Sequence, residues 1–206
     1  MSEANSKIVI FKNNLPNIYF MTSTQDYFYE LRIPKERVAV VIGKGGEMKK
    51  KLEIETKTKL DVDSEEGIVS ISGDNALHVF SSREVIRAIG RGFNPEIALM
   101  LLKQDYGLEI VNVADFAKNQ KDVIRLRGRV IGEKGKSRTT IEELTETYIS
   151  VFGKTISILG EFQGLSTARR AIEQLLEGSP HSNVYTWLEK QHKEMKRRGM
   201  LEYVKR

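Results

Sequence analysis

Hydrophobic and polar residues follow two rhythms along this chain, and together they predict a repeated order of short elements. Alternating positions predict strands, whereas apolar residues three and four apart predict helices. In the first half the order is strand, helix, glycine loop, helix, strand, strand and helix. These segments are expected at residues 27–33, 35–42, 43–46, 47–55, 58–63, 68–72 and 75–89. A break that contains Gly and Pro follows, and then a short helix over residues 96–102.

The second half repeats this order, which indicates an internal duplication. Its segments are expected at residues 108–113, 122–131, 132–135, 136–145, 148–152, 155–159 and 165–176. Residues 41–46 (VIGKGG) align with residues 130–135 (VIGEKG) at an offset of 89, and the returning strand aligns at an offset of 87. The difference falls in a turn between paired strands, where changes of length are tolerated. We therefore expect two similar domains.

The domain limits follow from the same segments. We expect an N-terminal extension, a first domain, a second domain and a basic C-terminal helix at residues 1–25, 26–104, 105–180 and 181–206. Within the extension, residues 7–11 form a candidate short strand that nearby Asn and Pro residues end.

Two of the predicted helices carry expectations about their buried sides. In the helix at residues 75–89, Leu77, Phe80 and Ile89 are expected inside, with the charged residues outside. The C-terminal helix is expected from about residue 183 to residue 198. It is expected to dock on the second domain through its apolar residues, and the alternative is that it extends an RNA surface or holds a partner.

Composition narrows the class of protein. The 206 residues are 40% hydrophobic and 30% charged, which is typical of a folded globular chain. A net charge of +5 favours a polyanionic partner only weakly. The chain has no cysteine, its three histidines lie far apart, and it lacks a long apolar run and a signal-peptide core. We therefore expect no metal, no cofactor, no membrane contact and a cytoplasmic location.

The glycine loops carry the most specific chemistry. Main-chain amides meet a phosphodiester closely only where no Cβ intervenes. The helix that follows each loop also directs free N–H groups and the positive end of its dipole toward the phosphates. Lys44 and Lys134 add positive charge inside the loops. One Gly-x-x-Gly alone is more often an ordinary turn, but two copies, each after Val-Ile and in the same element order, favour nucleic-acid binding.

This pattern resembles the KH domain of the eukaryotic type (type I). The resemblance implies an α/β (α+β sandwich) fold of two tandem KH domains, each a three-stranded sheet packed by three helices. It also implies that each loop grips the backbone of about four single-stranded nucleotides while an apolar groove reads the bases. The resemblance and the flanking basic residues give these candidate RNA-binding residues: Gly43, Lys44, Gly45, Gly46, Val40, Ile42, Lys49, Lys50, Arg129, Ile131, Gly132, Glu133, Lys134, Gly135, Lys136 and Arg138.

The segment at residues 87–93 (RAIGRGF), the paired modules and the terminal helix resemble the archaeal Partner-of-Nob family of ribosome assembly factors. That resemblance implies binding near the 3′ end of small-subunit 16S rRNA. It implies as partners the Nob endonuclease and other late small-subunit assembly or initiation factors. The first loop is intact here, whereas it is degenerate in the family's eukaryotic relatives. Glu133 would repel phosphate unless it points away.

Other functions have weaker support in the sequence. Gly135-Lys136-Ser137 resembles the end of a P-loop, but that motif needs a glycine at position 130, which is Val130. Paired carboxylates such as Asp61 and Asp63 are more typical of a solvated strand edge than of a metal site. We therefore predict a protein that is not an enzyme. The remaining alternative is a protein-interaction scaffold in ribosome assembly or translation initiation, with the KH modules used partly for protein contacts.

Overall fold

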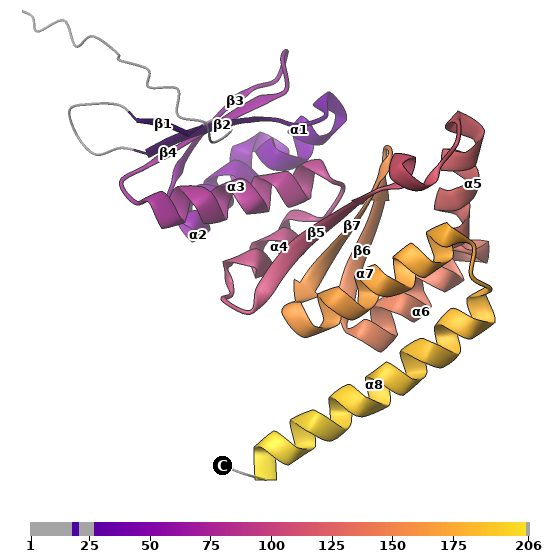
Figure 1. Cartoon of the computed structure of the whole chain (residues 1–206). Coiled ribbons are helices and arrows are strands. Elements are labelled where there is room, and N and C mark those ends of the chain that lie inside the picture. Colours follow the sequence, from indigo (N-terminus) through magenta and orange to yellow (C-terminus); the bar gives the residue numbers. More distant parts are fainter. Residues whose placement is uncertain (1–17, 21–26, 205–206) are drawn as a thin grey trace, which may run out of the picture. The chain divides into compact units, whose positions relative to one another are not determined.

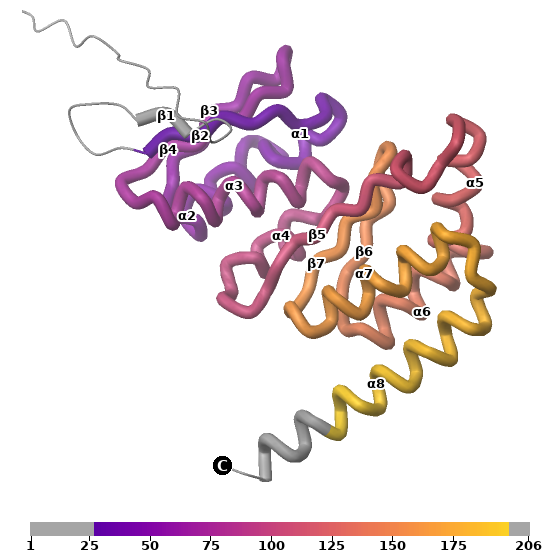
Figure 2. The backbone as a smooth tube through the Cα atoms, viewed as in Figure 1, coloured from indigo at the N-terminus to yellow at the C-terminus, as the bar shows by residue number. Residues whose placement is uncertain are grey.

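The computed structural model describes residues 18–20 and 27–204, and the candidate strand at residues 7–11 lies outside them. The chain divides into two compact units at Leu102, two residues before the predicted end of the first domain (Figures 1 and 2). Each unit is an α/β domain in which helices pack against an antiparallel sheet. The predicted fold class is therefore confirmed.

In the first unit, the helices pack with a sheet whose strand order is β1-β2-β4-β3. The elements are β1 (Ile18–Phe20), β2 (Tyr27–Arg32), α1 (Lys35–Ile42), η1 (Lys44–Gly46), α2 (Glu47–Thr56), β3 (Lys59–Asp63), β4 (Ile68–Gly73), α3 (Ala76–Gly90), α4 (Pro95–Ala98) and η2 (Leu99–Leu102). Strands β2, β4 and β3 form the expected three-stranded sheet, and β1 pairs with the free edge of β2.

The second unit repeats this plan without the extra strand, in the order β5-β7-β6. Its elements are β5 (Tyr106–Asn112), η3 (Val113–Phe116), α5 (Gln120–Ile131), η4 (Glu133–Gly135), α6 (Lys136–Thr145), β6 (Thr147–Phe152), β7 (Thr155–Glu161), α7 (Phe162–Glu177) and α8 (His181–Val204). Helix α8 runs along α6 and α7, and buried Val184 and Leu188 join it to the core of this unit (Figure 1).

The duplication extends to buried hydrogen bonds. Behind the first loop, the Thr56 hydroxyl donates to the Leu52 carbonyl at 2.7 Å and lies 2.8 Å from the Thr58 hydroxyl. Thr145 and Thr147, each 89 residues later, form the same 2.8 Å pair. Buried hydroxyls need such partners, so both units hold the helix after the loop to the following strand in the same way.

The predicted inner side of α3 is partly wrong. Ile89 is buried, but Leu77 is 74% exposed and Phe80 is 54% exposed. The buried side instead carries Val79 and Ile86, which lie seven residues apart. Seven residues make almost two helical turns, so Phe80 shares its side of the helix with the residue seven further on, an exposed arginine. Hydrophobicity alone did not resolve the phase of the first turn.

Candidate nucleic-acid interface

The two glycine loops share one backbone conformation. Each has three residues with positive φ, with values of 70°, 59° and 80° at Gly43, Gly45 and Gly46 and of 73°, 52° and 82° at Gly132, Lys134 and Gly135. A side chain in this left-handed region costs about 1–2 kcal/mol. Lys134 adopts this conformation although it has a side chain. The fold therefore imposes the same loop shape where glycine is absent.

The first glycine of each loop is required by packing. A Cβ on Gly43 would lie 2.5 Å from the Cβ of Met48, and a Cβ on Gly132 would lie 2.6 Å from the Cβ of Ser137. Both distances are far below van der Waals contact. The loop is therefore drawn tightly against the first turn of the helix that follows it.

The last glycine of each loop faces open space. For Gly46 and Gly135, the described residues place no atom within 4 Å of a built Cβ. Both glycines are also the N-cap residues of α2 and α6, and within the described chain neither helix has a side-chain cap. By contrast, Asn75 and Asn119 cap α3 and α5 with their side-chain oxygens. The N–H groups of Glu47 and Lys136 donate to the Lys44 and Glu133 carbonyls inside the loops. No side chain covers either helix start, so the positive end of each helix dipole faces the open side of the loop.

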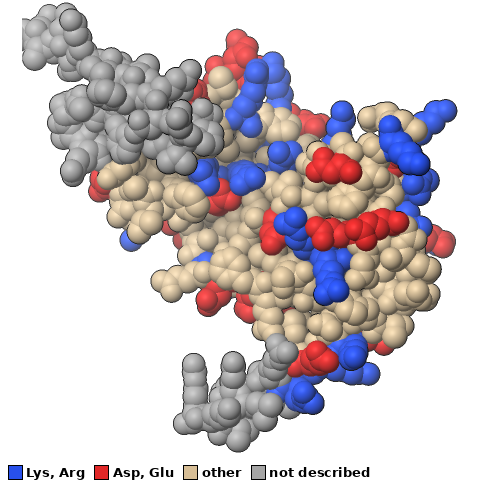
Figure 3. Space-filling model, in the orientation of Figure 1, with Lys and Arg blue, Asp and Glu red and all other residues tan. Residues whose placement is uncertain are grey.

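Exposed charges surround both loops. Lys44 and Lys134 are exposed, and so is Glu133, which takes the place of Lys44 in the second loop. Figure 3 shows Lys and Arg side chains gathered over α5 on the face in view. The flanking cations Lys50, Lys136 and Arg138 are exposed, and Lys49 is half-buried. Within the loops themselves, Glu133 in the place of Lys44 makes the second loop less positive than the first.

One of the cations beside the second loop, Arg138, is paired with a carboxylate of the same helix. Arg138 Nε lies 3.5 Å from Glu142 Oε2, and the backbone N–H of Ile149 donates to Glu142 Oε1 at 2.7 Å. Burial raises the pKa of Glu142 above its ordinary value, and this effect exceeds the lowering by the Ile149 N–H and by Arg138. Arg138 is a less available cation than Lys136.

The predicted groove residues lie in the helices before the loops. Val40, Ile42 and Ile131 are half-buried, so each can pack inward and still present apolar surface. Arg129 differs from them. Its guanidinium donates to the Leu175 and Ser179 carbonyls at 3.0 and 2.6 Å, which ties the end of α5 to the end of α7. The structure thus gives Arg129 an internal role, and its contact with RNA stays a prediction.

Gly128 is a candidate RNA-contact residue that the sequence analysis did not identify. It lies in the interior of α5, is exposed, and has no described atom within 4 Å of a built Cβ. Glycine there costs about 0.5–1 kcal/mol relative to alanine, and packing does not require it. The residue 89 positions earlier is Ala39, which is also exposed and small. The alignment of the two halves contained this signal, because a small residue precedes both loops by four positions.

Neither a metal-binding cluster nor a membrane-spanning helix is found among the described residues. Among them, no group of three or more His, Cys, Asp and Glu side chains is placed to hold a metal ion. Asp63 instead closes a turn by accepting the N–H groups of Glu65 and Glu66 at 2.9 and 3.0 Å. Over the same residues, no helix is both long and apolar enough to cross a bilayer.

Comparison with known proteins agrees with this geometry. Residues 107–193 match the family described as the eukaryotic type KH domain (KH domain type I), and residues 28–89 match the KH domain. A KH domain-containing protein of Methanocaldococcus jannaschii is 46% identical over 171 residues, which cover 81% of this chain and 75% of that protein. RNA-binding protein PNO1 of Oryzias latipes is 39% identical over 104 residues, which cover 50% of this chain and 43% of that protein.

A solved structure extends the match over both units. In the crystal structure of the a/eIF2alpha-aDim2p-rRNA complex from Pyrococcus horikoshii OT3, the matching chain superposes with a TM-score of 0.77 and 43% identity. The match covers 82% of this chain and 96% of that chain. The type I KH prediction and the family resemblance are both confirmed. The chain belongs to the archaeal PNO1/Dim2-type family of KH-domain ribosome assembly proteins.

Proposed function

We propose that this protein binds single-stranded RNA at the 3′ end region of small-subunit 16S rRNA during ribosome maturation, and that it acts by binding and not by catalysis. The observation that carries this proposal is the pair of open glycine N-caps, Gly46 and Gly135, each at the start of a helix without a side-chain cap. Such a helix start favours a phosphate group through the positive end of its dipole and through the room that the glycine leaves for close approach.

Family membership supports RNA as the source of that phosphate. KH loops clamp the backbone of about four nucleotides, so the protein reads a short single strand at each loop. A relative solved in a complex with rRNA and a/eIF2alpha supports rRNA as the target and an initiation factor as one partner. Two linked modules also raise the effective concentration of the second contact once the first has formed.

The partners and location follow from this role. We expect the Nob endonuclease, which trims the 3′ end, and other late assembly or initiation factors to act beside this protein in the cytoplasm.

Charge placed in the open N-caps tests the function. Gly46→Asp, Gly135→Asp and the double variant put a carboxylate where the phosphate would lie, in positions that have room for a side chain. Fluorescence anisotropy with a labelled 16S 3′-end oligonucleotide would measure RNA affinity, with a scrambled oligonucleotide as the reference. We expect a loss of at least about tenfold for each single variant and a larger loss for the double variant, because repulsion replaces a charge-assisted contact.

Gly153→Asp is the matched control. Gly153 also has positive φ and open space around a built Cβ, but it lies in the turn between β6 and β7, away from either helix start. The Gly153→Asp variant should lose less RNA affinity than either loop variant, and its melting temperature should be similar to theirs. If the double variant binds RNA as tightly as the unmodified protein, the RNA proposal fails and the protein-interaction scaffold becomes the better account.

A further inference from the structure

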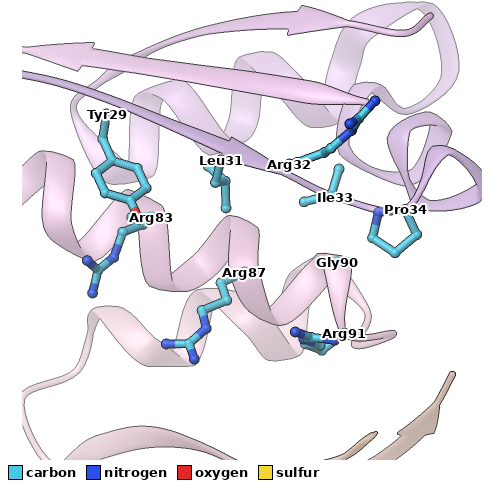
Figure 4. Close-up of a pocket in the computed structure, with 9 residues that line it drawn as sticks. All are labelled: Tyr29, Leu31, Arg32, Ile33, Pro34, Arg83, Arg87, Gly90 and Arg91. Carbon is cyan, nitrogen blue, oxygen red and sulfur yellow. The ribbon is translucent and has the colours of Figure 1, made fainter. Parts of the chain in front are cut away.

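Arginines in this protein are commonly held by a partner within the chain. Two of those that line a hollow of the first unit, drawn in Figure 4, are ion-paired. There, Arg32 pairs with Glu66 at 2.7 Å, and Arg83 pairs with Glu84 at 2.7 Å. In the second unit, Arg129 donates to two main-chain carbonyls at 3.0 and 2.6 Å. Such contacts fix the guanidinium and occupy its donors.

Arg127, in α5 of the second unit, is half-buried and yet has no such partner. Its Nε is shielded from solvent and makes no hydrogen bond. Among the residues that the structure describes, none forms a hydrogen bond or an ion pair with this guanidinium. A desolvated N–H without an acceptor is unfavourable, and a buried arginine is ordinarily paired. A ligand that offers acceptors to Arg127 therefore relieves a cost that is present in the free protein.

The first unit has an apolar residue at the position equivalent to Arg127. The two loops align at an offset of 89 residues, so Arg127 corresponds to Val38, which is buried with 3% exposure. The fold accepts an aliphatic side chain at this position and does not require an arginine. Residues that break a local packing rule in this way are typical of functional sites. The difference between the two copies therefore indicates a role for Arg127 in binding.

Helix geometry places Arg127 beside the second glycine loop. Two residues of an α-helix turn by about 200°, so Arg127 points to nearly the opposite side of α5 from Arg129, which is bound to the end of α7. Ile131, four residues further on, lies on the side of Arg127 and directly precedes Gly132. Arg127 is five residues before Gly132, a rise of about 7.5 Å along the helix. Since a KH loop clamps about four nucleotides, a base of the clamped strand can reach this guanidinium.

The shape of the guanidinium determines which bases it can recognise. Its parallel N–H donors match two neighbouring acceptors, such as O6 and N7 of guanine. Cytosine presents O2 and N3 side by side, whereas adenine and uracil offer no such pair on their Watson–Crick or Hoogsteen edges. A single strand exposes both of these edges to the protein. A phosphate, by contrast, is the same at every nucleotide and gives no selectivity.

We propose that Arg127 reads one base of the RNA strand held by the second glycine loop, and that it selects guanine or cytosine over adenine and uracil. The proposal rests on the RNA-binding function proposed above and adds base selectivity to one module. Val38 has no donor at the equivalent position, so the first unit does not make this contact. On binding, the unpaired guanidinium gains two hydrogen bonds to the base.

RNA pools with one fixed base test this selectivity. Tetranucleotide pools, each with A, C, G or U fixed at one position and the other positions random, would be titrated against the full chain. NMR shifts of the Gly135 and Lys136 amides would report binding at the second loop alone. At one position, we expect the guanine or the cytosine pool to bind about tenfold more tightly than the adenine pool, and the preferred pool identifies the base. Arg127→Gln should bind all four pools about equally.

Two further variants separate base reading from charge and from folding. Arg127→Lys keeps the charge without the fork, so it should not restore the selectivity. Arg127→Val installs the residue of the first unit, and it should melt no lower than the unmodified protein while it loses the selectivity. Arg125→Gln is the matched control, because it removes one exposed positive charge from the same helix. This control should keep the base preference.

Three results would overturn base reading by Arg127. The first is a base preference that survives in Arg127→Gln, or an unmodified protein without any preference. The second is an equal loss for all four pools in Arg127→Gln that Arg127→Lys restores, which would make the contact one with phosphate. The third is a lower melting temperature for Arg127→Val with unchanged selectivity, which would make Arg127 a structural residue. If the double variant of Gly46→Asp and Gly135→Asp keeps full RNA affinity, the proposed function itself fails, which is a different outcome.

Discussion

Gly43 and Met48 approach each other so closely that a Cβ on the glycine would lie 2.5 Å from the Met48 Cβ, whereas Gly46, three residues on, faces open space. The two glycines of one loop therefore serve different purposes. The first lets the chain pass the helix that follows it. The last leaves the start of that helix uncovered.

This difference predicts unequal losses of stability when each glycine is replaced by alanine. Gly43→Ala combines a steric clash with a φ of 70° and should lower the free energy of unfolding by about 3 kcal/mol or more. Gly46→Ala meets only the conformational cost, about 1–2 kcal/mol. Urea unfolding followed by circular dichroism measures both. Equal losses for the two variants would contradict the assignment of separate roles.

The charges inside the two loops predict a reciprocal exchange. Lys44 and Glu133 occupy equivalent places, and both side chains are exposed. Glu133→Lys should strengthen RNA binding by about five- to tenfold at low salt and steepen its salt dependence, since repulsion from the backbone becomes attraction. Lys44→Glu should do the reverse. Anisotropy titrations at several salt concentrations measure both effects, and changes of the same sign in the two variants would contradict the equivalence of the loops.

Arg129 predicts a change in stability with little effect on RNA. Its bonds to the Leu175 and Ser179 carbonyls are charge-assisted and partly buried, so Arg129→Ala should lower the free energy of unfolding by about 2 kcal/mol. Arg125→Ala is the control in the same helix, because its exposed pair with Asp122 is worth less than about 1 kcal/mol. An Arg129→Ala variant that stays stable but loses RNA affinity would contradict the internal role and support the predicted RNA contact.

Glu142 predicts a pH dependence of stability. Burial raises its pKa in the folded protein, so the folded state holds this proton more tightly than the unfolded chain does. The contribution of Glu142 is full below its ordinary pKa and is lost as pH rises through the raised value. Glu142→Gln keeps an acceptor for the Ile149 N–H without the charge. Its stability relative to the unmodified protein should therefore grow from about pH 4 to pH 7 in thermal unfolding. A constant or shrinking difference would contradict the buried-carboxylate account.

The sequence revealed the loops because their spacing is local and repeated. The helix predicted at residues 35–42 begins and ends as expected, since Pro34 and Gly43 fix both ends. Contacts between residues distant in sequence could not be predicted from local patterns. The Leu175 carbonyl that Arg129 binds lies 46 residues away, and no pattern within α5 indicates it.

The prediction of which residues of α3 face inward was wrong for a related reason. Asn75 caps the helix and sets which residues of the first turn face the sheet, but an apolar residue near a helix start carries no sign of its direction. Residue type alone therefore predicts that Leu77 and Phe80 lie in the core, although both are exposed. The contact between β2 and α3 could not be predicted either, because these segments meet only in the folded chain.

The central claim is that bare backbone amides at the two glycine loops meet phosphate. The most direct measurement is an NMR titration of the full chain with the 16S 3′-end oligonucleotide, read at the backbone amides. The account predicts that the largest shifts occur at Gly46 and Glu47 and at Gly135 and Lys136. These amides lie where the loop has room for a phosphate, and in the free protein they donate to carbonyls of the loop itself. Saturable RNA binding with these four amides unmoved would contradict it.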